Sequence, residues 1–460
     1  MDQTDKVHKM PIKPSYDQLL SCHETKVEEK VKKKGGCVDV EDSTLAAKAT
    51  ADVMNQGWRP CLDFQALSEL LVYYYPLSSK MSRRRSDRKL QLTYYSEGVP
   101  FVIATATCNL ATLNYIENID EEIALRLVPE VELNYQYEIS YHPLTLQVAK
   151  FPCGGFTIGV ALSHAVSDGF SFAMIMHALT ELAGGKSKPS VMPVWERERL
   201  VRGIDNKPAR VPGSNSDGLL ATSPYMPTYF MVHPNLIHAA GYRDDKSINI
   251  RPENIKKLRD TLVREDEFLN KEGVTTFEVL SAYIWKSRCR ALNLNLDGIT
   301  VLGFPVGIRH VLDPPVPRRY YGNSYMDVYI ELTVRELDES SISDIVKLVK
   351  RTKKSAYDKK NVEEELRNVE RLIKEDAKFE GLSDSLLFLT DMRNIGYFES
   401  VDFGWKEPVH VRPLTPESAK NLGMILRPSK VDPSMEGGVK VMMTLPRDAM
   451  VNFKQEMHIC

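Results

Sequence analysis

A segment rich in proline, glycine, serine and asparagine divides this chain of 460 residues, and it constrains the fold more than any other feature. It reads GIDNKPARVPGSNSDGLLATSPYMPTYF and spans residues 203–230. Strand-like and helix-like patterns occur on both sides of it, and the chain is too long for one compact core. The sequence therefore predicts an α/β protein with two domains, residues 1–205 and 231–460, joined by a crossover over residues 206–230.

Local patterns place several elements in the first half of the chain. The first 60 residues are atypical, because they are charged and poor in apolar side chains, which indicates a solvated or partly mobile segment. Alternation in KLQLTYYSEGVPFVIATAT (89–107) predicts a hairpin, and the basic stretch before it, KMSRRRSDRK (80–89), is typical of a solvated turn. After Gly169 the apolar residues recur with helical spacing, and Gly184 is expected to end that helix.

Composition and charge exclude several classes of protein. A net charge of −2 gives no indication of a nucleic-acid partner, and no apolar run is long enough to span a membrane. The seven cysteines include no CxxC pair and their number is odd. This pattern predicts free thiols, which are typical of a reducing compartment, so the expected location is cytoplasmic.

The motif SHAVSDGFS at residues 163–171 is the strongest candidate for chemistry. His164 ends a strand-like run, and the helix begins only near Gly169, so His164 and Asp168 do not share a helix face. No other His or Cys lies nearby at ligand spacing, so we expect no metal. The motif alone also fits a structural interpretation, in which Asp168 caps the helix and His164 is a core histidine.

Taken with four further segments, this motif resembles the plant BAHD acyltransferases, which transfer an acyl group from a CoA thioester to an alcohol or amine. SHAVSDG resembles the family's HxxxDG motif, and VDFGWKEPV resembles its DFGWG motif. The segments that carry the resemblance besides residues 163–169 are residues 151–164, 275–292, 314–323 and 401–409. The chain departs from the family at its amino terminus, at Lys406 where glycine is usual, and at Gly307 where aspartate is common.

The resemblance implies two chloramphenicol-acetyltransferase-like domains, each with a mixed β-sheet flanked by helices, and an active-site tunnel between them. It implies acyl-CoA as co-substrate, no permanently bound cofactor, a small-molecule alcohol as acceptor, and a monomer. His164 is expected to be the general base that accepts the proton of the attacking hydroxyl. An oxyanion then forms on the thioester carbonyl and requires a hydrogen-bond donor.

The other site residues are also assigned by resemblance. Asp168 is expected to pair with Arg309, which would fix the turn that carries His164. The remaining expected residues are Asp402 and Thr390 as catalytic candidates, Gly169, Gly404 and Trp405 as structural residues at the site, and Thr276, Lys286 and Arg288 as contacts to CoA. Structural alternatives stay open: a plain N-cap for Asp168, an ordinary strand threonine at position 390, and a solvated basic face for the helix.

The predicted function is an acyl-CoA-dependent O-acyltransferase of specialised metabolism. The segment KPSVMPVWERE (188–198) resembles family members that act on terpenoid, alkaloid or simple alcohols, which favours O-acylation over N-acylation. Lys406 and the atypical amino terminus keep a non-catalytic binding protein as the alternative. A hydrolase that uses His164 to activate water is the third hypothesis.

Overall fold

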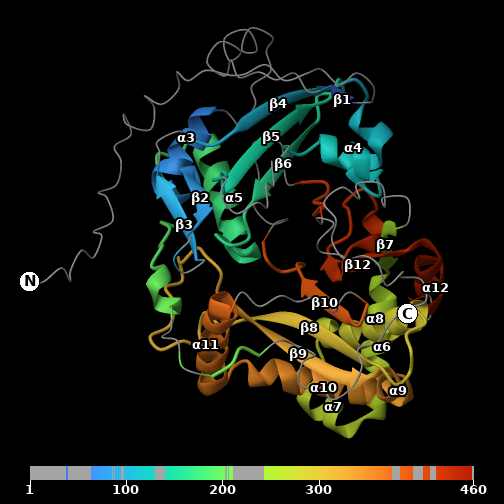
Figure 1. The fold of residues 1–460 in the computed structure, drawn as a ribbon. Helices are drawn as coiled ribbons and strands as arrows, with labels where there is room; N and C mark the ends of the chain where they lie inside the picture. The colour runs from blue at the N-terminus through green and yellow to red at the C-terminus, as the bar shows by residue number, and fades with distance from the viewer. Residues whose placement is uncertain are drawn as a thin grey trace, which may run out of the picture. The chain divides into compact units, whose positions relative to one another are not determined.

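The computed structural model of this chain forms two compact units (Figure 1). The N-terminal unit comprises residues 1–112, 122–195 and 397–408, and the C-terminal unit comprises residues 113–121, 196–396 and 409–460. The structure describes residues 38–39, 64–84, 86, 89–94, 98–129, 140–201, 205, 207–210, 243–375, 384–396, 408–414 and 421–457. Most of the predicted crossover, residues 206–230, lies outside these ranges.

The N-terminal unit contains a mixed four-stranded sheet in the order β1-β4-β5-β6. Strands β4 and β5 are parallel, and the other two pairs are antiparallel. The strands are β1 (Val38–Asp39), β4 (Phe101–Ala106), β5 (Leu144–Lys150) and β6 (Phe156–Leu162); the helices are α3 (Phe64–Tyr73), α4 (Glu121–Arg126) and α5 (Gly169–Ala183). The 3₁₀ segments are Tyr75–Ser78 in this unit, Leu110–Ile116 with residues assigned to both units, and Arg197–Leu200 and Pro433–Met435 in the C-terminal unit.

The hairpin predicted after residue 89 is wrong in its pairing. Strand β3 (Leu90–Tyr94) pairs antiparallel with β2 (Ser79–Arg83), whereas β4 belongs to the four-stranded sheet. The basic stretch interpreted as a turn therefore supplies a strand. Ser79 and Met81 of β2 are buried in alternation, but the polar side chain at position 79 hides that period in the sequence.

The helix predicted after Gly169 is confirmed and supplies much of the local core. Its residues Ile175, Leu179 and Leu182 are buried, as are Leu144, Leu146 and Val148 of β5. Helix α3 packs against α5, and the fully buried Tyr74 donates its hydroxyl to the carbonyl of Met174 at 3.5 Å. Gly184 caps the helix as expected, its amide donating to Thr180 O.

The C-terminal unit contains a mixed six-stranded sheet in the order β7-β12-β11-β10-β8-β9. Strand β10 is parallel to both β8 and β11, and the outer pairs are antiparallel. The strands are β7 (Arg243–Ile250), β8 (Ile299–Gly307), β9 (Tyr325–Thr333), β10 (Leu386–Asp391), β11 (Leu422–Leu426) and β12 (Val439–Pro446).

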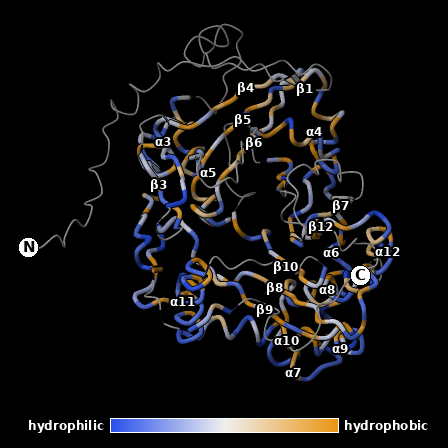
Figure 2. Tube along the Cα trace, in the orientation of Figure 1, coloured by the Kyte–Doolittle hydropathy of each residue, from blue (hydrophilic) through white to orange (hydrophobic). Residues whose placement is uncertain are grey.

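Seven helices are described in this unit, and α8 is the central one. They are α6 (Pro252–Glu265), α7 (Glu267–Glu272), α8 (Thr276–Ala291), α9 (Val334–Glu339), α10 (Ile342–Ser355), α11 (Lys359–Glu375) and α12 (Arg447–Met457). Trp285 of α8 is fully buried and donates to Thr300 Oγ1 at 3.1 Å. Figure 2 shows the contrast between hydrophobic β8 and the largely hydrophilic surface helix α11.

The first turn of helix α8 contains a fully buried acidic residue. Glu278 forms a capping box with Thr275 and receives ion pairs from Lys350, at 3.2 Å, and Lys353. Burial alone would raise the pKa of Glu278, but the hydrogen bonds from Lys353 and the amide of Thr275 lower it overall. The ionised carboxylate therefore joins α8 to α10.

The structure bears on two expectations from the sequence, that no segment spans a membrane and that all the cysteines are free thiols. No helix among the described residues is long and apolar enough to cross a membrane. The expectation of seven free thiols is wrong at Cys108, which is disulfide-bonded. Cys153 and Cys289 are free. Spacing in the sequence does not reveal which cysteines the fold brings together.

Candidate functional site

His164 lies in a tight turn between the end of β6 and the start of α5. The amide of Ser163 donates to Pro143 O at 2.8 Å, and the amide of Val166 donates to Ser163 O at 2.9 Å. His164 itself is exposed, whereas the residues that follow it, from Val166 to Asp168, are buried. His164 is therefore not a core histidine. Its imidazole lies on a turn whose backbone is hydrogen-bonded at Ser163 and at Val166.

Asp168 is the N-cap of α5. Its Oδ1 accepts hydrogen bonds from the backbone amide of Ser171 at 2.8 Å and from the Ser171 hydroxyl at 2.6 Å. Asp168 is 9% exposed and Ser171 is fully buried, so water does not weaken these contacts. The capping role left open by the sequence is present, and Gly169 begins the helix. Ser171 is a contact that the sequence argument missed.

Arg309 follows β8 and donates hydrogen bonds to the segment of residues 320–323, which reads YYGN. Its Nη1 donates to Tyr320 O at 2.7 Å and its Nη2 donates to Gly322 O at 3.0 Å. Arg197 contacts the same segment, donating to Tyr321 O at 3.2 Å. Gly322 has φ +153°, and a Cβ there would lie 2.6 Å from the Tyr320 hydroxyl, so glycine is required. Arg309 and Asp168 belong to different units, and their ion pair stays a prediction.

Thr390 lies on β10, beside Met424 of β11, and is half-buried. The next residue, Asp391, accepts two hydrogen bonds from Arg393, at 2.9 and 2.7 Å. Thr390 therefore lies near the end of β10, in the part that pairs in parallel with β11. Asp402, Gly404, Trp405 and Lys406 lie outside the described residues.

The three residues assigned to CoA lie on α8, in different surroundings. Thr276 is the first residue of the helix and is half-buried. Lys286 is half-buried, donates to Ser340 O at 2.7 Å, and has its pKa lowered by burial. Arg288 is 3% exposed and donates to Asp384 O at 2.9 Å. The Arg288 guanidinium is therefore held inside the unit by a backbone carbonyl, and its contact with CoA stays a prediction.

No group of three or more His, Cys, Asp or Glu residues among those that the structure describes is arranged to hold a metal ion. The chemistry available at the turn is proton transfer by an exposed imidazole.

The chain is similar to known acyltransferases. A model of the Transferase family matches residues 64–459. The chain is 64% identical over 394 residues to the spermidine coumaroyl-CoA acyltransferase of Arabidopsis thaliana, covering 85% of this chain and 83% of that relative. It is 50% identical to the spermidine sinapoyl-CoA acyltransferase of the same plant, covering 85% and 84%.

Solved structures show the same fold. Vinorine synthase matches with a TM-score of 0.62 at 21% identity, over 90% of this chain and 86% of that one. TRI101 of F. sporotrichioides, complexed with coenzyme A and T-2, matches with a TM-score of 0.63 at 16% identity, over 92% of each chain. The α/β fold with mixed sheets flanked by helices is therefore the one predicted.

Proposed function

Because the chain belongs to the Transferase family, the BAHD acyltransferases, we propose that its acyl-CoA-dependent transfer acts on an amine of a polyamine such as spermidine. The observation that carries the proposal is the exposed His164 on its capped turn, in a chain 64% identical to a spermidine acyltransferase. Two relatives at 64% and 50% identity are both named for spermidine. They favour an amine over the hydroxyl acceptor predicted from residues 188–198.

The reaction consumes a free amine and a thioester, and releases an amide and the thiol of CoA. The amine nitrogen attacks the carbonyl carbon, which forms a C–N bond and places negative charge on the carbonyl oxygen. His164 accepts one proton from the nitrogen as its positive charge develops. When the C–S bond breaks, the proton passes from His164 to the CoA sulfur, so His164 ends the cycle neutral.

The described contacts support a positioning role for the helix cap. A general base must lie within hydrogen-bond reach of the proton that it removes. The turn of Ser163 to Val166 is anchored to β5 through Pro143 and to α5 through the Asp168 cap. These bonds restrict the backbone of His164 before the acceptor arrives, which reduces the entropy lost in the transition state.

We keep Thr390 and Asp402 as proposed site residues, and Thr390 has a test of its own. A hydroxyl at position 390 would donate to the oxyanion, and one such donor is worth about 10²–10³ in turnover. Thr390→Ser retains the hydroxyl and should retain turnover, whereas Thr390→Val should lose it. Equal turnover by both variants would leave Thr390 as an ordinary strand residue.

The acceptor class is tested with matched molecules. The purified chain is incubated with coumaroyl-CoA and spermidine, 1,8-diaminooctane or 1,8-octanediol, and products are identified by mass spectrometry. We expect amides from both amines and a much slower reaction with the diol. Rapid ester formation with no amide would restore O-acylation. Release of CoA that does not depend on any acceptor would indicate a hydrolase.

The base is tested with a histidine pair. His164→Ala should lower turnover by about 10²–10⁴. His177→Ala on α5 is the matched control, because this residue is half-buried away from the turn and should retain near-normal turnover. Similar turnover by both variants would remove His164 from the mechanism.

A further inference from the structure

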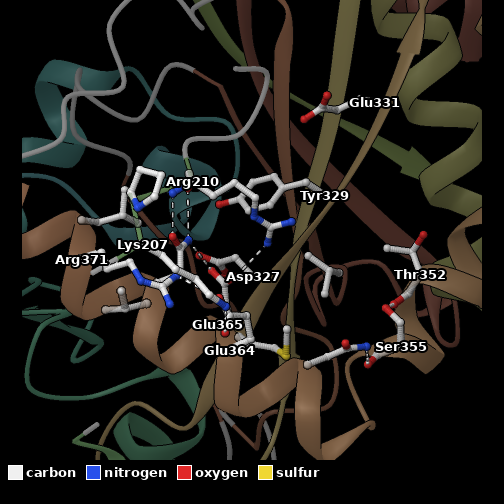
Figure 3. Close-up of a pocket in the computed structure, with 17 residues that line it drawn as sticks. Lys207, Arg210, Asp327, Tyr329, Glu331, Thr352, Ser355, Glu364, Glu365 and Arg371 are labelled. Atoms are coloured by element: carbon white, nitrogen blue, oxygen red, sulfur yellow. Dashed lines mark hydrogen bonds and ion pairs between the residues drawn. The ribbon is translucent and has the colours of Figure 1, made fainter. Parts of the chain in front are cut away.

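A cavity of about 860 Å³ lies entirely within the C-terminal unit (Figure 3). Its walls come from β9, α10, α11 and residues 207–210. Volumes of a few hundred to about 1,000 Å³ are typical of small-molecule sites in proteins. No site residue predicted from the sequence lines this cavity.

Strand β9 presents a polar face to the cavity. Burial alternates along the strand, with even-numbered residues from 326 to 330 buried in the core and odd-numbered ones partly accessible. Because side chains alternate across a strand, Asp327, Tyr329 and Glu331 share the second face. Figure 3 shows Asp327 near Glu365 and Arg210, with Glu331 farther along the strand.

The basic side chains of the cavity are paired with other acidic residues. Arg210 binds Glu365 at 3.0 Å, and Lys207 lies 3.6 Å from Glu364. Arg371 binds Glu364 at 2.9 Å, and its other donors contact Asp205 at 2.6 and 2.7 Å. The cations of this wall are therefore already neutralised.

Asp327 differs from these acidic residues. Its Oδ1 atom is buried and has no hydrogen-bond partner, and no ion pair to Asp327 occurs in the described part of the chain. Burial raises the pKa of Asp327 to about 6, and the charge of Glu365 adds to the increase. At neutral pH the carboxylate is mostly ionised without compensation, which is unfavourable unless a cation binds beside it.

The lining also contains the apolar residues Pro208, Val369 and Leu372, whereas Met326 and Val328 of β9 are buried in the core. A bare metal ion would need several acidic or histidine ligands together, and no such group occurs among the residues that the structure describes. An aliphatic ammonium has the complementary composition, with a charged end for a carboxylate and methylene groups for apolar walls.

We propose that this cavity binds an ammonium group of an aliphatic polyamine, with Asp327 as its charge partner. The preference for an organic cation follows from the cavity itself, while the choice of spermidine as probe rests on the proposed function. Arg210 and Arg371, held by their own ion pairs, leave Asp327 available to the ligand. Binding requires ionised Asp327, so affinity should fall as the pH decreases through about 6.

The test is calorimetric titration of the full chain with spermidine, without acyl-CoA. A hydrogen bond between two charged groups is strong enough that Asp327→Asn should weaken binding by about 10-fold or more. Asp260→Asn is the matched control, because this exposed carboxylate on α6 removes the same charge outside the cavity. Asp327→Asn removes a buried unpaired charge, so it should fold, and thermal unfolding verifies this.

The outcomes separate this inference from the proposed function. Absence of spermidine binding, or equal weakening by Asp327→Asn and Asp260→Asn, would refute the polyamine cavity. Selective weakening by Asp327→Asn would support it. Acylation of spermidine is measured separately, so a chain that binds spermidine through Asp327 but forms no amide would contradict only the proposed function. A chain that forms the amide while Asp327→Asn binds normally would contradict only the cavity.

Discussion

Removing the Asp168 carboxylate should destabilise the N-terminal unit more than loss of an ordinary helix cap. The carboxylate accepts two hydrogen bonds from Ser171, and both residues are buried. The capping bond to the amide is worth about 1 kcal/mol. The bond from the hydroxyl to the charged carboxylate adds about 1.5–3 kcal/mol. Asp168→Ala should therefore lower the free energy of unfolding by about 2.5–4 kcal/mol.

Two further variants and a control apportion this loss. Asp168→Asn keeps an acceptor for the amide and should cost less than Asp168→Ala. In a double-mutant cycle of Asp168→Ala and Ser171→Ala, the two losses of stability should be less than additive, because both variants remove the hydrogen bond between the Ser171 hydroxyl and the Asp168 carboxylate. Ser341→Ala removes the exposed cap of α10, where Ser341 accepts from the Asp344 amide at 3.1 Å. It should cost about 1 kcal/mol.

Denaturant unfolding measures the stabilities, and turnover with coumaroyl-CoA and spermidine measures the consequence at the site. Asp168→Ala should lower turnover because the turn that holds His164 loses an anchor, whereas Ser341→Ala should not. If Asp168→Ala cost no more than Ser341→Ala, or if the losses at Asp168 and Ser171 were strictly additive, the buried hydrogen bond would not stabilise the turn.

Three more outcomes follow from the structure. The pKa of Asp327 is about 6 when folded and 3.8 when unfolded, so the native state holds the extra proton and stability falls as pH rises from about 4 through 6. Asp327→Asn should abolish this dependence, gaining up to about 3 kcal/mol over the wild type at pH 7 without ligand; an unchanged pH profile of unfolding would contradict it. Glu278→Gln should lower the free energy of unfolding, measured with denaturant, by about 3–5 kcal/mol, because it leaves the ammonium groups of Lys350 and Lys353 poorly compensated. A loss below about 1 kcal/mol would show that these charges are not coupled. Asp168→Asn and Arg309→Gln should show less than additive stability losses if the predicted ion pair forms, and additive losses would exclude it.

The sequence predicted elements well where the signal is local. Helical spacing after Gly169 and the stop at Gly184 are properties of consecutive residues, and both match α5. The predicted pairing of β3 is wrong because one of the two buried positions of β2 is the polar Ser79, so the period of β2 is hidden in the sequence.

Contacts between distant segments left little trace in the sequence. From the sequence, Arg288 is consistent with a basic surface. In the folded chain Arg288 is buried, and its guanidinium donates to Asp384 O. The cavity around Asp327 needs β9, α11 and residues 207–210 together, so no short motif predicts it. The site turn was predictable because it lies within one stretch of nine residues, 163–171, where the cap and the histidine are neighbours.

We propose that His164 supports transfer of an acyl group to a polyamine nitrogen. The most direct measurement is product analysis after equal times with wild-type protein and His164→Ala, using coumaroyl-CoA and spermidine. Coumaroyl-spermidine amide from the wild type, reduced about 10²–10⁴-fold in the variant, is the predicted result. Amide formed at the same rate by His164→Ala, or no amide from the wild type under conditions where it esterifies a diol, would contradict the account.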